Sequence, residues 1–347
     1  MPTVAQATMT AFGSAMFQAS GMPADQAEIA THHLVESNLV GHDSHGVIRI
    51  PAYINGIKAG NLRPVGQQKI VRESPASMVL DANRSFGIVL AYEAMREAVT
   101  RAKQHTFGAV AVHQSGHIGR LGAYPPIAAE EGCIGVILLN GGARFMAPFG
   151  GVGRRLPPNP ISISVPVENG PHMMLDITTS IAAGGKVDLY RARGVQVPDG
   201  WLVDSKGEAV TDPAAFWQDD VAMLPVGGPV GYKGYGLAMM IDAIAGGLSW
   251  AGCSAAQPTR GGSGYMALAI NIEAFIDLAE FKRETRTLVD WVKSSPTMPG
   301  VPKIMVPGEI EDDVRAERTA NGIPIEDATW DAICESATEL GVEIPAV

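Results

Sequence analysis

Hydrophobic positions along the chain repeat at two spacings, and each spacing predicts a different secondary-structure element. Ala27, Ala30 and Leu34 recur every three or four residues, the period of an amphipathic helix, with Pro23 near its start and Gly41 at its end. Similar stripes predict helices at 50–60, 91–102, 237–248, 275–292 and 327–340. Short apolar or alternating runs predict strands at 69–81, 109–112, 133–140, 161–167, 172–177 and 265–272.

The order of these elements predicts an α/β protein. Strand 109–112, a helix that ends near Gly132 and strand 133–140 follow one another as in a βαβ-like unit. Strands 161–167 and 172–177 are separated by the turn sequence at 168–171. Helical patterns dominate the first 60 residues and the last 20.

Two junctions between a loop and a helix carry polar residues. The first runs from strand 172–177 through Thr178, Thr179 and Ser180, whose hydroxyls predict a helix start that binds an anion. We expect Lys186 about two turns into that helix, where it either pairs with a carboxylate or faces solvent. The second junction, 227–236, is rich in glycine but lacks the P-loop ending. It leads into a helix whose apolar face comprises Leu237, Met240, Ile241, Ile244 and Leu248.

Composition excludes several classes of function. The net charge is −10 and no run of lysine or arginine occurs, which argues against nucleic-acid and anionic-membrane binding. The apolar stretch 237–248 is interrupted by Asp242 and glycines, so we expect no membrane span. Three well-separated cysteines and the absence of a secretory signal pattern favour a reducing, cytoplasmic location.

The densest polar cluster lies at 42–46 and is followed by Arg49. Because free histidine has a pKa near working pH, an imidazole of this cluster, His42 or His45, is suited to exchange a proton with a reacting oxygen, with Ser44 orienting the ring or the oxygen. His42, Asp43 and His45 also form a candidate metal-ligand set, although three near-adjacent residues rarely converge on one ion. A third interpretation is that the histidines cap a helix.

A second polar cluster follows strand 109–112. His113, Ser115 and His117 are expected in a glycine-containing loop at the carboxyl end of that strand, where α/β sheets bind their ligands. Catalytic and structural roles stay equally open for these histidines. No G-x-G-x-x-G pattern occurs in the chain, so a bound dinucleotide would need a site other than a Rossmann fingerprint.

The residue sequences of these motifs resemble those of the malate/L-lactate dehydrogenase family of the second, non-Rossmann type. The resemblance rests on motifs at 41–46, 115–119, 158–160, 175–180, 184–186, 198–212 and 233–237, and so covers nearly the whole chain. Within the family, segments 117–120, 147–149, 291–293, 307–309 and 318–324 resemble the hydroxycarboxylate dehydrogenase B subgroup.

The resemblance implies a fold, a division into domains and an activity. It implies a mixed-sheet cofactor domain like that of sulfolactate dehydrogenase at 76–299, and a mainly helical domain from both termini at 1–75 with 300–347. It further implies a homodimer that transfers a hydride reversibly between NAD, or alternatively NADP, and a 2-oxo or 2-hydroxy acid. Three rival classes stay open, namely a metal-dependent hydrolase or lyase, a cyclic imino-acid reductase, and a non-catalytic binding protein.

The resemblance also implies roles for individual residues. His45 becomes the acid/base, His117 the alternative, with Ser44 and Lys186 beside them, and Arg49 is suited to the substrate carboxylate. A lysine at 186 favours a keto acid over a cyclic imine. Tyr232 stands where the subgroup has a histidine, in a loop with two extra residues. The implied cofactor contacts are His45, Gly119, Arg120, Leu121, Met174, Leu175, Asp176, Ile177, Thr178, Tyr232, Lys233, Gly308, Glu309, Ile310 and Glu311.

Overall fold

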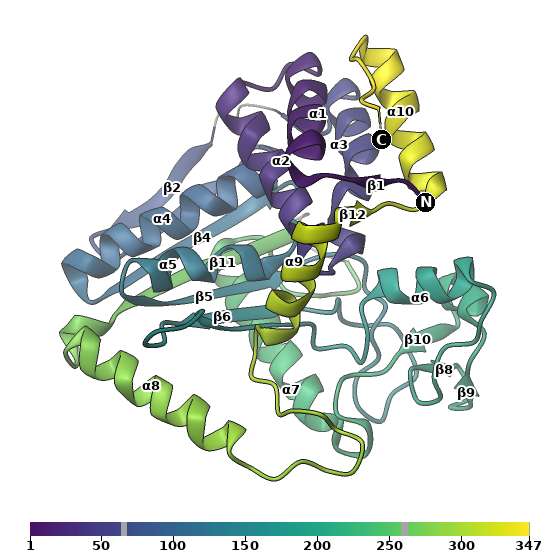
Figure 1. The fold of residues 1–347 in the computed structure, drawn as a ribbon. Helices are drawn as coiled ribbons and strands as arrows, with labels where there is room; N and C mark the ends of the chain where they lie inside the picture. The colour runs from purple at the N-terminus through teal and green to yellow at the C-terminus, as the bar shows by residue number, and fades with distance from the viewer. Residues whose placement is uncertain (64–67, 258–262, 347) are drawn as a thin grey trace.

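A mixed seven-stranded sheet lies at the centre of the computed structural model, which describes residues 1–63, 68–257 and 263–346 (Figure 1). Its strand order is β2-β3-β4-β11-β5-β6-β7. The strands of this sheet are β2 (Lys69–Ser74), β3 (Ser77–Asp81), β4 (Phe107–Ser115), β5 (Cys133–Asn140), β6 (Ile161–Val165), β7 (Met173–Ile177) and β11 (Ser263–Asn271). The mixed α/β fold expected from the sequence is thereby confirmed.

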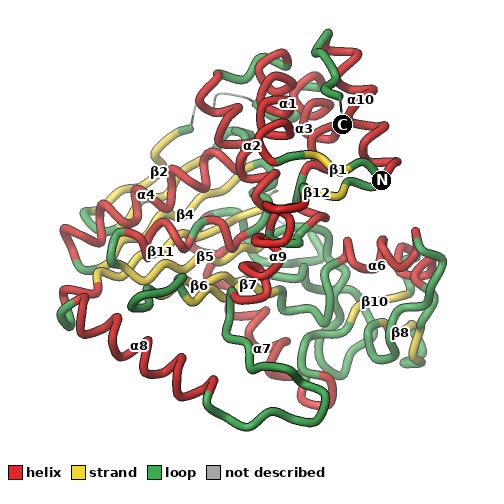
Figure 2. Tube along the Cα trace, in the orientation of Figure 1, coloured by secondary structure: helices red, strands yellow, loops and turns green. Residues whose placement is uncertain are grey.

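The helices surround this sheet in groups that Figure 2 shows in red. They are α1 (Gln6–Ala19), α2 (Ala24–Leu39), α3 (Ile50–Lys58), α4 (Gly87–His105), α5 (Pro125–Glu130), α6 (Gly184–Ala192), α7 (Tyr232–Ile241), α8 (Leu278–Lys293), α9 (Glu309–Asn321) and α10 (Asp327–Leu340). A π-helical segment, Asp242–Gly247, continues α7. The helices and strands expected along the chain are therefore present, and α10 has the bounds that its periodicity predicts.

Strand pairing departs from the βαβ-like unit in one respect. β3 and β4 pair in parallel, whereas β11 lies between β4 and β5 and is antiparallel to both. β4 and β5 therefore point the same way but are not neighbours, and the prediction of a βαβ-like unit is wrong about adjacency. A strand from more than 120 residues further along the chain fills the gap.

Helices cover both faces of the sheet. Side chains alternate along β5, so that Ile137 packs with α4 and α5 while Leu138 packs against Ile241 and Ala245 of α7 and the π-helical segment. Burying both faces gives these strands their nearly continuous apolar sequences. The result is three layers of helix, sheet and helix around the largest strands.

The two ends of the chain meet in a helical group above the sheet (Figure 1). α1, α2, α3 and α10 share one core, and β1 (Thr3–Val4) pairs with β12 (Ile323–Pro324).

The division into domains at 1–75 with 300–347 and at 76–299 stays a prediction. β2 nevertheless pairs with β3 in the large sheet, across the predicted boundary. Residues 64–67 and 258–262 of these ranges lie outside the described part.

A smaller lobe holds α6 beside a three-stranded sheet. Its strands are β8 (Leu202–Asp204), β9 (Ala209–Val210) and β10 (Val221–Met223), packed around Phe216 and Val187. α6 begins at Gly184, so Lys186 lies in its first turn rather than two turns into it. Among the residues that the structure describes, no helix is both long and apolar enough to cross a bilayer.

Candidate active site

The polar segment 42–46 forms a tight turn between α2 and α3. Asn38, at the end of α2, holds this turn because its Oδ1 accepts the Val47 N–H at 2.8 Å and its Nδ2 donates to Asp43 Oδ1 at 2.7 Å. Gly46 packs on the same amide, and a Cβ there would lie 2.0 Å from Asn38 Oδ1. The glycine in this motif therefore allows the turn to close on Asn38.

The side chains of this turn face different partners. His42 Nε2 lies 3.3 Å from Glu311 Oε1, and Asp43 pairs with Arg318 through two contacts of 2.5 and 3.1 Å. His45 instead faces Ser44. The three candidate metal ligands therefore diverge, and no group of three ligating side chains converges anywhere in the described ranges. The geometry does not support the metal-dependent hydrolase or lyase.

His45 and His117 form a stacked pair of imidazoles. Their ring centroids are 5.6 Å apart and their planes are inclined by 21°. Ser44 Oγ lies 3.1 Å from His45 Nδ1, and Tyr53 Oη lies 2.6 Å from His117 Nδ1. In both rings the Nδ1 atom is occupied by a hydroxyl, which orients the ring and leaves Nε2 for a ligand.

Both imidazoles are poor proton acceptors in the free protein. Burial lowers the pKa of His45 to about 3, with His117 and then Arg49 adding to the effect. Burial among the surrounding groups likewise lowers the pKa of His117 to about 4, with Arg49 as the second cause, although the residue as a whole is exposed. Both rings are therefore neutral at pH 7 unless an anion binds beside them.

Arg49 stands ready to bind such an anion. Its Nε donates to the Ser44 carbonyl at 2.7 Å, which fixes the side chain next to the turn. Within the described part of the chain, no hydrogen bond or ion pair engages its two terminal nitrogens. A guanidinium edge that is fixed but unpaired suits bidentate binding of a carboxylate.

A buried arginine and a carboxylate mark the first of the predicted cofactor segments. Arg120 is only 5% exposed, and its Nε and Nη1 have no hydrogen-bond partner. Asp176 of β7 accepts the Gly122 N–H at 2.7 Å, and burial raises its pKa while Arg120 opposes that shift. Buried guanidinium nitrogens without a hydrogen-bond partner are costly, so this segment fits an anionic group such as a dinucleotide diphosphate.

The second and third cofactor segments lie side by side. The Met174 N–H donates to the Pro307 carbonyl at 3.0 Å, which brings Gly308 against β7. Gly308 has a φ of 101° and starts α9, whose Glu311 reaches His42. Segments 119–122, 174–176 and 308–311 thus border one region next to the stacked imidazoles, and together they fit a dinucleotide.

The anion site predicted at 178–180 is wrong. The Thr178 and Thr179 hydroxyls both donate to the Pro158 carbonyl, at 3.0 and 2.6 Å, and Ser180 Oγ donates to the Ala182 carbonyl. α6 starts only at Gly184, after Ala183 at the N-cap position. These hydroxyls fasten the end of β7 instead of capping a helix.

The remaining predicted residues lie at different distances from the imidazoles. Gly185 packs on Ser44, since a Cβ at 185 would lie 2.9 Å from Ser44 Cβ, and this brings the exposed Lys186 to the border of the site. Tyr232 packs on Phe149, and among described residues no bond or ring contact links it to either imidazole. His113, expected in the loop, is a buried residue of β4.

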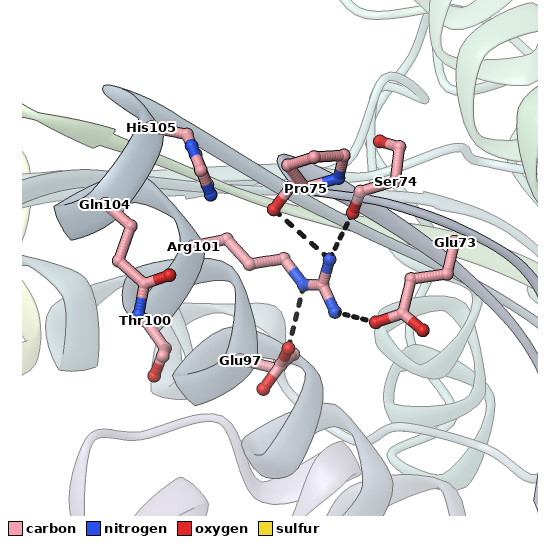
Figure 3. Close-up of a pocket in the computed structure, with 8 residues that line it drawn as sticks. All are labelled: Glu73, Ser74, Pro75, Glu97, Thr100, Arg101, Gln104 and His105. Carbon is pink, nitrogen blue, oxygen red and sulfur yellow. Dashed lines mark hydrogen bonds and ion pairs between the residues drawn. The ribbon is translucent and has the colours of Figure 1, made fainter.

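A cavity of about 430 Å³ lies away from the imidazoles, beside the turn between β2 and β3 (Figure 3). There Arg101 of α4 binds Glu73, Glu97 and the Ser74 carbonyl, which ties the β2–β3 turn to the helix. Because these contacts occupy its donors, we interpret Arg101 as a structural tie.

Two functional candidates were not singled out by their sequence. Tyr53, which orients His117, lies in the helix expected at 50–60, where an aromatic residue predicts core packing. His33 bonds to the backbone of Arg120, 87 positions away, and no local pattern signals that contact. The hydrogen bonds of both residues depend on how helices and loops pack.

Comparison with known proteins agrees with the geometry. Residues 4–334 match the family model described as malate/L-lactate dehydrogenase. Hydroxycarboxylate dehydrogenase B from Escherichia coli K12 is 35% identical over 342 residues, which cover 96% of this chain and 93% of that protein.

Two solved structures share the whole fold. Malate dehydrogenase from Entamoeba histolytica superposes with a TM-score of 0.94 at 28% identity, over 99% of both chains. Sulfolactate dehydrogenase from Methanocaldococcus jannaschii gives a TM-score of 0.89 at 32% identity, over 98% of both chains. The resemblance in fold expected from the sequence is confirmed.

Proposed function

Because the chain belongs to the malate/L-lactate dehydrogenase family, we propose that it is a nicotinamide-dependent 2-hydroxyacid dehydrogenase. The observation that carries this proposal is the stacked pair His45 and His117 beside the unpaired guanidinium edge of Arg49. Reduction of a 2-oxo acid requires a proton for the ketone oxygen and a cation for the carboxylate. His45 and Arg49 lie close together in the chain and offer the proton and the cation.

His45 is our proposed acid/base. Its Nδ1 is beside the Ser44 hydroxyl, which both donates and accepts, so Nε2 can gain or lose a proton without disturbing that contact. His117 is the alternative carrier, but its Nδ1 also receives the Gly119 N–H at 3.3 Å. Protonation of Nδ1 would break that contact, which favours His45.

Arg49 is the proposed carboxylate site, and the substrate itself completes the proton chemistry. A bound carboxylate offsets the positive charge of Arg49, one of the causes of the low pKa of both imidazoles. Binding of the oxo acid therefore favours uptake of the proton that reduction consumes.

A nicotinamide dinucleotide supplies or accepts the hydride when bound. We propose that Arg120 neutralises its diphosphate and that Asp176 accepts a ribose hydroxyl, since both side chains have unused capacity beside Gly122. The segment 308–311 borders the same region. NAD is favoured, with NADP as the alternative, because Asp176 and Glu311 disfavour an additional phosphate.

The direct test is loss of NADH or NADPH absorbance with a panel of 2-oxo acids that includes pyruvate, oxaloacetate, 2-oxoglutarate, phenylpyruvate and sulfopyruvate. We expect turnover with at least one of them and no loss of rate after treatment with a chelator. Cyclic imino acids tested in parallel address the reductase alternative. If neither nucleotide binds or is oxidised with any substrate, a non-catalytic binding protein becomes the better interpretation.

We propose further that the protein is a homodimer. Of the apolar helix face that the sequence predicts, Ile241 packs against the sheet, but the other four residues are exposed in the single chain, at 37% for Leu237, 58% for Met240, 37% for Ile244 and 58% for Leu248. A continuous apolar helix face of this kind is typical of an interface. A second copy of the chain is the occupant that the family membership suggests.

A further inference from the structure

His33 lies beneath the loop that carries His117 and Arg120. It belongs to α2, its side chain is completely buried, and its Nε2 accepts the Arg120 N–H at 3.0 Å. Since Nε2 is the acceptor, the proton of the neutral ring is on Nδ1, which is buried without a partner. The backbone of Arg120 thus relies on this one imidazole.

The loop is shaped to reach that ring. Gly119 has a φ of 65°, and a Cβ there would lie 2.1 Å from His33 Nε2, so only glycine permits the approach. The ring itself is held by stacking on Tyr124, with centroids 5.4 Å apart and planes inclined by 24°. The Tyr124 hydroxyl also donates to the Ile118 carbonyl, so two side chains hold consecutive parts of one loop.

This anchoring extends to the active site through one peptide. Gly119 N–H donates to His117 Nδ1, while the next amide, Arg120 N–H, donates to His33. A shift of the loop would move both donors together and release His117 from Gly119. It would also move the Arg120 side chain out of its buried position.

We propose that His33 is a positioning residue which, through the backbone of Gly119 and Arg120, sets the orientation of His117 and of the Arg120 guanidinium. This inference rests on the proposed function for its kinetic consequences, but the contact itself does not. A residue that only filled the core would need no acceptor, and an apolar ring would avoid an unpaired Nδ1–H. Burial lowers the pKa of His33 well below its usual range, which keeps the acceptor available.

Two substitutions separate the acceptor from the bulk of the side chain. His33→Gln can place a carbonyl oxygen near the position of Nε2, whereas His33→Leu fills space without an acceptor. We expect His33→Leu to lower kcat/KM with NADH and the oxo acid by about tenfold or more, and His33→Gln to stay within about threefold of wild type. The NADH Kd from fluorescence titration should rise with His33→Leu only.

A second readout does not depend on activity. In ¹⁵N-histidine spectra, with His117 assigned through His117→Asn, the His117 Nδ1 resonance should move in His33→Leu and stay near its wild-type position in His33→Gln. Ile333→Ala, a core substitution in α10, serves as the stability control because Ile333 is fully buried outside the loop. It should lower the Tm without moving this resonance.

The outcomes are distinct. An unmoved His117 resonance and unchanged kinetics in His33→Leu would overturn the inference, as would equal losses in His33→Gln and His33→Leu. If His33→Leu does not fold, His33→Asn, which is too short to reach Arg120 N–H, replaces it with the same expectations. A wild-type protein that turns over no substrate would refute the proposed function, while the resonance shift would still test the role of His33.

Discussion

At the residue scale, two cationic side chains and two imidazoles lie close together. Burial and the nearby positive charges determine the protonation state of the two imidazoles. Burial, then the His117 ring and then Arg49 lower the pKa of His45, so the free protein holds a neutral, hydroxyl-oriented imidazole. A neutral ring is the form that removes a proton from a hydroxy acid. The reduction direction requires the charged form, which the anionic substrate must help to create.

His45→Ala removes the proposed acid/base. We expect kcat to fall by at least about 10²-fold while the NADH Kd changes by less than about threefold, because the ring acts mainly in the transition state. Initial rates and fluorescence titration measure the two quantities. His117→Asn is the matched comparison, and a larger kcat loss there than in His45→Ala would transfer the acid/base role to His117.

The pH profile follows from the direction of the shifts. With pKa values of about 3 and 4 for His45 and His117, the charged fraction of the free protein falls tenfold per pH unit above that range. We therefore expect kcat/KM for reduction to decline with a slope near −1 from about pH 5.5 to 8, and kcat/KM for oxidation to stay flat there. An inflection near pH 6.5 in the reduction profile would show that the carrier keeps an ordinary pKa.

Residue types and motif sequences together predicted that Ser44, His45, Arg49 and His117 belong to the site, and the structure brings these residues together. Their catalytic roles stay proposals. The sequence did not separate His42 and Asp43 from them, because divergence within a turn depends on partners such as Glu311 on α9. His33 escaped notice for the same reason, since nothing in the local sequence of this helix signals its contact with the backbone of Arg120.

α9 links several parts of the site at the scale of elements. Its first turn borders β7, while its side chains reach back to α2 and to the turn after it through Arg315–Glu36, Arg318–Asp43 and Glu311–His42. Arg318 also donates to the Asn38 carbonyl at the end of α2. The helix therefore fixes the proposed cofactor segment 308–311 relative to the catalytic turn.

Arg318→Met should loosen that link. We expect the KM for the nucleotide to rise about threefold to tenfold and the free energy of unfolding to fall by about 1 kcal/mol, because a partly buried, multiply bonded guanidinium is lost. Steady-state kinetics and urea unfolding measure both. Asp313→Asn on the same helix, which breaks the exposed pair of Asp313 with Lys303 in the preceding loop, should leave the KM unchanged. Equal effects of the two substitutions would refute a specific role for Arg318.

Elements with a clear period were predictable, but junctions between them were not. α10 follows its apolar stripe from Asp327 to Leu340, as expected. Thr178 and Thr179 have the composition of a helix start, yet the Pro158 carbonyl takes their hydroxyls and the helix begins at Gly184. A competing acceptor from 20 residues earlier is invisible to a local pattern.

Long-range pairing shapes the molecule as a whole. The insertion of β11 between β4 and β5 could not be predicted from the chain order. β11 follows β5 only after more than 120 residues, which is far longer than a βαβ-like unit. The apolar stripe of α7 is a different case. Its periodicity predicted one apolar helix face, and in the single chain that face is buried at Ile241 but exposed at Met240 and Leu248.

Met240→Glu tests whether a second copy covers that stripe. Met240 is 58% exposed in the single chain, so a charge there is tolerated by the monomer but costly in an apolar interface. We expect light scattering during size-exclusion chromatography to give twice the chain mass of 36.5 kDa for the wild type and a shift toward the single-chain mass for the variant. Circular dichroism should stay unchanged.

The choice of surface is tested by Trp291→Glu on α8, where an equally apolar residue is 76% exposed. Both variants add the same charge to an exposed helix face, so they differ only in which face they alter. Dissociation in Met240→Glu alone assigns the interface to α7, because a general effect of added negative charge would appear in both. Dissociation in Trp291→Glu alone would place the interface on α8. A wild-type protein that elutes as a monomer would refute the proposed homodimer.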